Sequence, residues 1–249
     1  MSEICLEVRD LVKSYQKNIA AVDGLSFTLH KGEILGLIGT NGAGKSTTVS
    51  MLATLMKPDT GEILFQGEDL VHHPKKLRSK IGYVPQEIAL YESLSGYDNL
   101  MFWGRAGHVP ACDLKARMQK VAELIGFTEP MLQKKVQEYS GGMKRRLNIG
   151  VALLAEPELL ILDEPTAGID IQSRRLILTA IKGLAEQGVA VIYVGHYMEE
   201  VEELCDTVCI MNQGKAIYKG SIGDGLQYQN RTFSLEELYE ELLMKEALA

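Results

Sequence analysis

Alternating apolar and polar residues fill the first part of the chain, as in the stretch 26–30, which reads SFTLH. A period of two is typical of strands that bury one face. The pattern over residues 3–31 therefore predicts a small, partly antiparallel sheet, which Gly32 ends. Residues 33–38 and 61–66 are expected to form two further strands, the second of which Gly67 ends.

Residues 95–154 show helical periodicity instead. Near the middle of this segment, apolar positions spaced by four, three and four residues share one helix face: Leu114, Met118, Val121 and Ile125. Pro110 and Pro130 mark the two ends of that helical stretch. The whole segment is therefore expected to be mostly helical.

From residue 158 onward, two short apolar runs are separated by a segment with helical periodicity. Residues 159–162 are all apolar, and residues 189–194 contain only apolar side chains and Tyr193, as buried parallel strands do. The stretch between them carries a helical stripe made of Ile171, Leu178, Ile181 and Leu184. This alternation predicts an α/β fold with a mainly parallel sheet covered on both faces.

The end of the chain predicts a short amphipathic helix. Ser234 and Glu237 have the spacing of a capping box. The leucines that follow fall on one helix face: Leu235, Leu238 and Leu242. We expect this helix to pack on the body of the protein, within a C-terminal tail at about residues 222–249. No long linker or repeat divides the chain, so residues 1–249 are expected to form a single domain.

The composition, with 46% hydrophobic and 24% charged residues, is that of an ordinary globular protein. The formal net charge of −7 gives no basic footprint for nucleic acid, so no nucleic-acid partner is expected. No apolar run approaches the ~20 residues that cross a bilayer, and the first residues are acidic where a signal peptide is basic. We therefore expect a cytoplasmic chain, which would serve a membrane only by docking to another chain.

Four cysteines are scattered along the chain: Cys5, Cys112, Cys205 and Cys209. The last two are four residues apart, a spacing that two zinc ligands can use. No second cysteine or histidine pair completes a zinc set, so buried free thiols are predicted.

The strongest chemical signal is the segment 39–47, between a predicted strand and a predicted helix that begins near Gly44. Its first eight residues fit the phosphate-binding pattern G-x-x-x-x-G-K-[ST] at every fixed position. Glycines let backbone N–H groups curl around phosphate oxygens, and the helix N-terminus adds positive charge there. We expect Lys45 to reach the outer phosphates and the Ser46 hydroxyl to bind Mg²⁺, with Thr47 close by.

The residues of this segment are therefore candidates for nucleotide binding: Gly39, Thr40, Asn41, Gly42, Ala43, Gly44, Lys45, Ser46 and Thr47. A chance glycine-rich turn is the alternative, and the motifs farther along the chain argue against it.

A second signal follows the apolar run 159–162, which ends in Asp163, Glu164 and Pro165. Carboxylates at the tip of a buried parallel strand lie where ligands bind in such sheets. We expect Asp163 to hold Mg²⁺ beside the phosphate loop, and Glu164 to act as a general base toward water. The alternative is that both acids only favour the start of the next helix.

Residues 139–143, Tyr-Ser-Gly-Gly-Met, resemble the signature motif of ATP-binding cassette (ABC) ATPases, whose family form is Leu-Ser-Gly-Gly-Gln. The Ser-Gly-Gly centre matches, and Arg146 matches the arginine that follows it in the family. Without the resemblance, Ser140, Gly141 and Gly142 would indicate a helix cap. The resemblance implies that they clasp the γ-phosphate held by the phosphate loop of a second protomer.

Other family positions are matched in order along nearly the whole chain. By resemblance, Tyr15 stacks on adenine, with a core tyrosine as the alternative. Gln86 is similar to the glutamine that touches Mg²⁺ and senses the membrane partner. Asp170 belongs to a loop that crosses the dimer interface, and His196 matches the switch histidine that contacts the γ-phosphate.

Three positions depart from the family pattern. Thr40 replaces a frequent proline, and Ala167 replaces the serine that usually begins the loop of Asp170. Gly195 stands where the family has threonine or serine before the switch histidine. The phosphate loop works through backbone N–H groups, so Thr40 should be tolerated, whereas Gly195 leaves the hydrogen bonding around His196 open.

The resemblance implies a P-loop NTPase core with an N-terminal antiparallel β subdomain and a helical subdomain inserted at about residues 95–154. It implies an ATPase that uses ATP and Mg²⁺ and is completed by a second copy of the chain. The implied metal ligands are Ser46, Gln86 and Asp163. The implied catalytic residues are Lys45, Gln86, Glu164 and His196.

A separate transmembrane permease is the other partner that the resemblance implies, with the chain peripheral on the inner face of the cell membrane. Apolar groups near Gln86 are candidates for docking to it, or equally for the core of the helical subdomain: Leu90, Tyr91, Leu94 and Tyr97. The Tyr-Ser-Gly-Gly-Met form is similar to the type-2 exporter branch, which includes drug, lipid and polysaccharide exporters. The rival functions are a non-transport ABC ATPase, a small-molecule kinase and a regulatory nucleotide-binding module.

Overall fold

A six-stranded sheet forms the centre of the computed structural model, which describes residues 3–16, 19–223, 226–229 and 231–248. Its strand order is β10-β9-β3-β8-β7-β6. All neighbours pair in parallel except β10, which runs antiparallel at one edge. The strands are β3 (Ile34–Gly39), β6 (Ile81–Val84), β7 (Leu159–Asp163), β8 (Ala190–Val194), β9 (Thr207–Asn212) and β10 (Lys215–Ser221).

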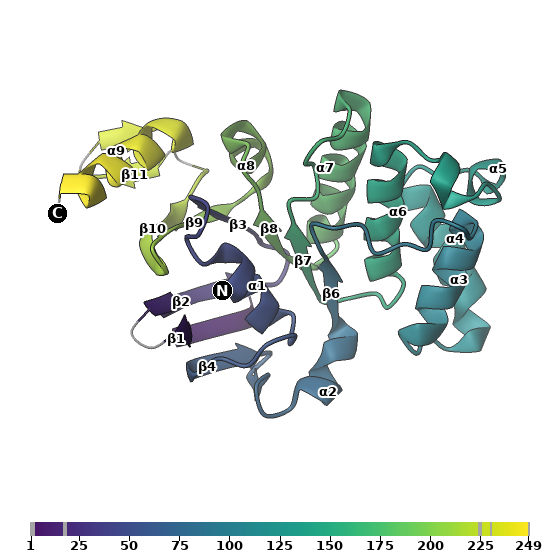
Figure 1. The fold of residues 1–249 in the computed structure, drawn as a ribbon, viewed down its shortest axis with the longest axis horizontal. Helices are drawn as coiled ribbons and strands as arrows, with labels where there is room; N and C mark the ends of the chain where they lie inside the picture. The colour runs from purple at the N-terminus through teal and green to yellow at the C-terminus, as the bar shows by residue number, and fades with distance from the viewer. Residues whose placement is uncertain (1–2, 17–18, 224–225, 230, 249) are drawn as a thin grey trace.

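The central strands are buried along their whole length, because helices cover one face of the sheet and α1 (Lys45–Leu52) with the antiparallel sheet covers the other (Figure 1). Leu160 and Leu162 of β7 point into the core beneath the helices, whereas Leu159 and Ile161 point into the opposite core. The covering helices are α1 on one side, and α6 (Gly141–Leu153), α7 (Ile171–Glu186) and α8 (Met198–Leu204) on the other. The predicted parallel α/β sheet is confirmed.

The predicted antiparallel sheet is confirmed as well. Its four strands are ordered β2-β1-β4-β5 and share the second core with α1. Val8 pairs with Phe27 on one side and with Ile63 on the other. The strands are β1 (Ile4–Gln16), β2 (Ile19–His30), β4 (Thr60–Phe65) and β5 (Glu68–Asp69).

The helices of the predicted helical segment gather at one end of the molecule (Figure 1). They are α3 (Gly96–Ala106), α4 (Ala111–Leu124), α5 (Glu129–Leu132) and α6. The predicted apolar stripe is confirmed, since Leu114, Met118, Val121 and Ile125 are all buried in the core that also contains the β7 leucines. A short helix α2 (Pro74–Leu77) and single 3₁₀ turns at Arg78–Lys80 and Val136–Glu138 complete the connections.

The C-terminal segment contains a two-stranded sheet of β11 (Leu226–Tyr228) and β12 (Arg231–Phe233), then α9 (Leu235–Leu248). The predicted capping box is formed, because Ser234 N donates to Glu237 Oε2 at 2.9 Å and Glu237 N donates to Ser234 Oγ at 3.3 Å. The predicted leucine stripe is buried against α8 and the sheet: Leu235, Leu238 and Leu242.

Two details of the sequence analysis were wrong. Ile171 begins α7 and is 78% exposed, so it lies outside the face that the helix buries; the other predicted stripe residues lie on that face, with Ile181 buried and Leu178 and Leu184 partly buried against the core. Cys112 is exposed at the start of α4, whereas the other three cysteines are free buried thiols as predicted. Within the described part of the chain, no helix combines the length and the apolar character needed to cross a bilayer.

Candidate functional site

The phosphate loop connects β3 to α1 and turns on glycines. Gly42 and Gly44 have φ values of 81° and 101°, a region that other residues rarely adopt. A Cβ at Gly44 would lie 2.2 Å from the Ala21 carbonyl oxygen, so no side chain fits there. Ala43 N donates to Thr40 O at 3.1 Å and closes the turn. The backbone is thereby curled at the N-terminus of a helix, where anions bind.

Lys45 is the first residue of α1, and its side chain is folded back over the loop. Nζ donates to Gly39 O at 2.8 Å and to Thr40 O at 3.1 Å. The residue is only 7% exposed, and burial lowers the pKa of the ammonium, against the opposing charges of Glu164 and Asp163. A cation is therefore held within the ring of backbone groups that would face phosphate.

Asp163 ends β7, against which α1 packs, so its carboxylate and the Ser46 hydroxyl come from neighbouring elements. Burial raises the pKa of Asp163, as does the charge of Glu164, while Lys45 opposes the shift. The hydroxyl, the carboxylate and the Gln86 amide offer the oxygen ligands that Mg²⁺ prefers. Among the described residues there is no cluster of three or more metal-binding acids, histidines and cysteines. The oxygen donors named above are of the kind that Mg²⁺ takes, and the ion would complete its ligands with water and phosphate oxygens.

Glu164 joins two other predicted catalytic residues. Its Oε1 lies 2.6 Å from His196 Nε2, and its Oε2 accepts from Gln86 Nε2 at 2.9 Å. Its φ is 49°, and its backbone N–H donates to Val194 O at 2.9 Å. A left-handed backbone is uncommon outside glycine, although Glu164 shares it with several other described residues. Gln86 and His196, expected by resemblance to face Mg²⁺ and γ-phosphate, both point to this carboxylate.

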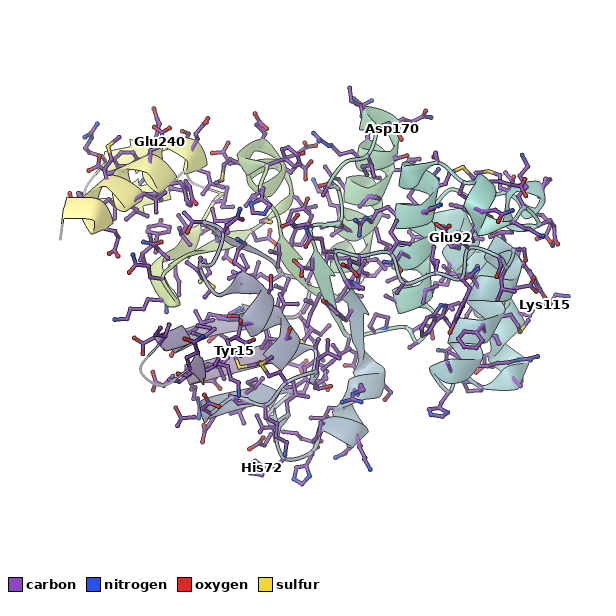
Figure 2. All side chains as sticks on the ribbon, viewed as in Figure 1. Tyr15, His72, Glu92, Lys115, Asp170 and Glu240 are labelled. Carbon is purple, nitrogen blue, oxygen red and sulfur yellow. The ribbon has the colours of Figure 1, made fainter. Side chains whose placement is uncertain are left out.

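Tyr15 is 61% exposed, which excludes the core tyrosine that was its alternative (Figure 2). Its hydroxyl lies 3.3 Å from Thr47 Oγ1 and 3.5 Å from Met56 Sδ. The ring therefore stands beside the first turn of α1 and is accessible for stacking on a base.

The signature residues meet a different part of the chain. Ser140 caps α6, since its Oγ accepts from Met143 N at 3.2 Å. A Cβ at Gly142 would lie 2.2 Å from Ser173 Oγ and 2.7 Å from Asp170 Oδ2. Asp170 Oδ1 accepts from Ser173 N at 2.8 Å, and this backbone hydrogen bond lowers the pKa of Asp170. The segment 140–142 therefore packs on the start of α7.

The two phosphate-binding segments are thus separated within one chain. Gly39 and Gly44 of the phosphate loop lie against Met211 and Ala21, whereas Gly142 lies against Ser173 and Asp170. Figure 1 places α1 over the centre of the molecule and α6 with the helices at its end, and Figure 2 shows Asp170 at the tip of α7.

Two residues of α6 form hydrogen bonds with the segment that contains Gln86. The sequence analysis assigned a role to neither of them. Arg145 donates to Pro85 O at 3.1 Å, and Asn148 Oδ1 accepts from Ala89 N at 3.2 Å. Burial lowers the pKa of Arg145, against the charges of Glu164 and Asp163. Arg146 instead donates to Ile125 O at 2.7 Å and so ties α6 to α4. The basic run containing Arg145 was visible in the sequence, but not its contact.

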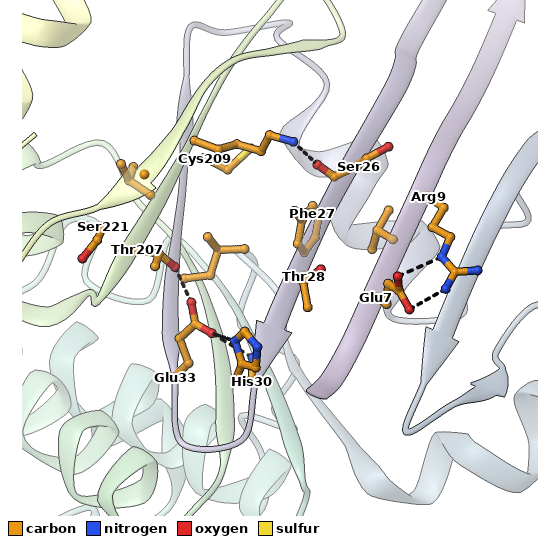
Figure 3. A pocket seen from close by; sticks show the side chains of 15 residues that line it. Glu7, Arg9, Ser26, Phe27, Thr28, His30, Glu33, Thr207, Cys209 and Ser221 are labelled. Atoms are coloured by element: carbon orange, nitrogen blue, oxygen red, sulfur yellow. Dashed lines mark hydrogen bonds and ion pairs between the residues drawn. The ribbon is translucent and has the colours of Figure 1, made fainter. Parts of the chain in front are cut away.

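A cavity of about 540 Å³ lies elsewhere, between the two sheets (Figure 3). Glu33, which lines the cavity, makes two polar contacts there. Its carboxylate accepts from Thr207 Oγ1 at 2.6 Å and lies 2.8 Å from His30 Nδ1. None of the predicted site residues lines this cavity, and its polar groups already contact one another.

Comparisons with known proteins agree with this geometry. The family model described as "ABC transporter" matches residues 22–167. The linearmycin resistance ATP-binding protein LnrL of Bacillus subtilis (strain 168) is 50% identical over 219 residues, covering 88% of this chain and 70% of that protein. A Nod factor export ATP-binding protein I of Rhizobium sp. (strain N33) is 38% identical, covering 89% and 72%. A solved structure of an ATP binding subunit of an ABC transporter has a TM-score of 0.86 at 32% identity, covering 96% of this chain and 99% of that one.

Proposed function

Because this chain belongs to the ABC transporter family and is an ATP-binding ATPase subunit, we propose that two copies of it enclose ATP between them and drive a separate membrane permease. The observation that carries the proposal is the separation of two phosphate-binding segments within one chain. Lys45 lies in one of these segments and Ser140 in the other, on different elements that face different neighbours. A head-to-tail pair related by a two-fold axis brings the two segments together twice.

In this arrangement the phosphate loop and Lys45 hold the triphosphate, and Tyr15 stacks on the base. Glu164 accepts a proton from the attacking water, which is typically worth ~10²–10⁴-fold in rate. Because Glu164 is ionised when it acts as a base, its carboxylate only accepts, so His196 donates from Nε2 and holds the carboxylate toward the phosphate. Mg²⁺, held by Ser46, Asp163 and water, would offset the phosphate charge.

The Ser-Gly-Gly segment of the partner copy supplies helix N-terminal N–H groups to the γ-phosphate. ATP then stabilises the closed dimer, and hydrolysis removes the bridging contacts. The free energy by which ATP favours the closed dimer is limited by the difference in ATP affinity between the open and closed states.

An apolar surface near Gln86 is the proposed docking site for the permease. Tyr91 and Phe102 are 45% and 43% exposed, with ring centroids 4.9 Å apart. Leu94 and Ile88 add exposed aliphatic groups, whereas Leu90 and Tyr97 pack mainly on the core. Exposed apolar side chains that gather on one face favour a protein partner.

Export is the proposed direction, because two relatives are named for antibiotic resistance and for Nod factor export. The chain would then be a peripheral protein on the inner face of the cell membrane, held there by its permease.

Membrane isolation tests the transport part of the proposal. The tagged chain should co-purify with a multi-span membrane protein, and Tyr91→Ala with Phe102→Ala should release it while leaving ATP binding intact. Recovery of the chain with ribosomes or DNA instead would contradict a transport role.

A further inference from the structure

A buried hydrogen-bond network lies directly behind Glu164 and His196. Tyr193 of β8 is fully buried, and Thr166 and Glu200 are nearly so. Thr166 Oγ1 donates to Glu200 Oε2 at 2.6 Å, and the Tyr193 hydroxyl donates to the same oxygen. Burial and the hydrogen bond to Glu200 raise the pKa of Tyr193, so its phenol remains a proton donor.

Arg174 of α7 balances the charge of this buried carboxylate. Its Nε lies 2.9 Å from Glu200 Oε1, and its guanidinium stacks 4.6 Å above the centroid of the Tyr197 ring. A buried carboxylate is costly unless it keeps such partners, so each of these groups constrains the others. Two hydroxyl groups and one guanidinium therefore converge on a single buried carboxylate.

The network joins the three segments that carry the proposed site residues. Thr166 follows Glu164 by two residues, and Tyr197 follows His196 directly. Arg174 lies in the first turn of α7, where its N–H donates to Asp170 O at 2.9 Å. A shift of Glu200 would therefore displace all three segments together.

The Tyr193 ring has room in this network because Gly195 has no side chain. The family resemblance leads one to expect a hydroxyl residue there, but a Cβ at Gly195 would lie 2.6 Å from Tyr193 Cε1. Gly195 is not in the left-handed region, so its backbone conformation would accept another residue. It is the Tyr193 ring that leaves no room for a side chain at this position. Tyr193 and Gly195 are thus sterically matched, because the tyrosine ring fills the space that a side chain at position 195 would need.

From these contacts we infer that Tyr193 and Glu200 are positioning residues of the ATPase reaction, acting by holding His196 against Glu164. The inference rests on the proposed roles of Glu164 and His196. Neither positioning residue contacts Glu164 or His196 through a side-chain hydrogen bond in the structure, so the effect passes through the loops.

The test compares kcat and KM for ATP of the full chain with those of Tyr193→Phe, which keeps the ring and removes the hydroxyl. We expect kcat to fall about 10-fold, with KM changed by less than about twofold. Tyr218→Phe is the matched control, since its hydroxyl donates to Gln227 O at 3.3 Å in the C-terminal part of the chain, and it should keep wild-type kcat.

A double-mutant cycle separates positioning from simple stability. In a His196→Ala background, Tyr193→Phe should cause no further loss of residual turnover. An equal fractional loss in both backgrounds, or a Tyr193→Phe kcat within about twofold of wild type, overturns the inference. If Tyr193→Phe does not fold, as judged by thermal unfolding, Glu200→Gln enters the same cycle under the same criteria. Wild-type turnover in His196→Ala or Glu164→Gln would instead contradict the proposed function itself.

Discussion

His196 Nε2 lies 2.6 Å from Glu164 Oε1, although the two residues are 32 positions apart and follow different strands. Strands β7 and β8 are adjacent and parallel, so their carboxyl ends reach the same edge of the sheet. The left-handed backbone at Glu164 turns its carboxylate toward the β8 side. The contact is therefore a product of strand order, and it places a base and a histidine at one point.

Replacing Glu164 by glutamine should leave ATP binding intact and reduce turnover by about 10²–10⁴-fold, because an amide cannot accept the proton of water. The ATP-bound dimer should also live longer, since hydrolysis is what opens it. Single-turnover hydrolysis and dimer lifetime are the measurements. Glu156→Gln is the control, because Glu156 also has a positive φ, of 51°, but precedes β7 at the opposite sheet edge. Wild-type single-turnover rates in Glu164→Gln would refute the assignment.

Lys45→Ala should weaken ATP binding by about 10–100-fold, because a charge-assisted hydrogen bond contributes ~1.5–3 kcal/mol. Titration with a fluorescent ATP analogue measures the loss. The control is Lys215→Ala, which removes only a largely exposed ion pair with Asp23 at 3.3 Å. Equal affinity of wild type and Lys45→Ala would exclude the phosphate loop as the nucleotide site.

Gly142→Ala should block ATP-driven dimerisation while the monomer still binds ATP. A Cβ there lies 2.2 Å from Ser173 Oγ, so the start of α6 must move. Light scattering of the Glu164→Gln protein with and without Gly142→Ala compares the two dimer fractions. Gly183→Ala is the control, because a Cβ at that helical position meets nothing within 4 Å. A full dimer fraction with Gly142→Ala would argue against a role for the signature segment at the interface.

The stability of the nucleotide-free protein should depend on pH through Asp163. Its pKa is raised above the ordinary 3.8, so between 3.8 and the raised value the folded state binds more protons than the unfolded state. The free energy of unfolding then falls as pH rises through that window. Asp163→Asn should remove this dependence and raise the nucleotide-free Tm near neutral pH by roughly 2–4 °C per kcal/mol gained.

The same variant should lose the extra stabilisation that Mg·ATP gives the wild type. Thermal unfolding from pH 4 to 8, with and without Mg·ATP, tests both effects. A lower nucleotide-free Tm for Asp163→Asn across the whole range would show that the carboxylate stabilises the fold instead.

Local chemistry made several features predictable from the sequence. The phosphate loop is contiguous, so its glycines, Lys45 and the helix that follows could be located from one segment. The stripe through Leu114 and Ile125 follows helical spacing, and the capping box needs only Ser234 and Glu237. The error at Ile171 arose because the spacing of apolar residues identifies one face of a helix, but not whether the core covers the first turn of that face.

The strands β6, β9 and β10 and the β11–β12 sheet were not predicted. β6 has only four residues, and β10 is a partly exposed edge strand, so neither carries a clear apolar run. Cys112 was misassigned because a cysteine carries no periodic signal of its own, and its exposure depends on how α4 sits on the other helices.

The sequence by itself determined the elements that have a clear hydrophobic period and the kind of ligand to expect, because hydrophobic period, glycine placement and motif spacing act over a few neighbouring residues. Only the tertiary structure decided which side chains meet. Gln86 reaches Glu164 across 78 positions, and Tyr193 meets Glu200 behind them. Such contacts depend on strand order and helix packing, which bring distant segments together. For the same reason only the fold shows that Ser140 and Lys45 lie on separate elements, which the proposed dimer would bring together.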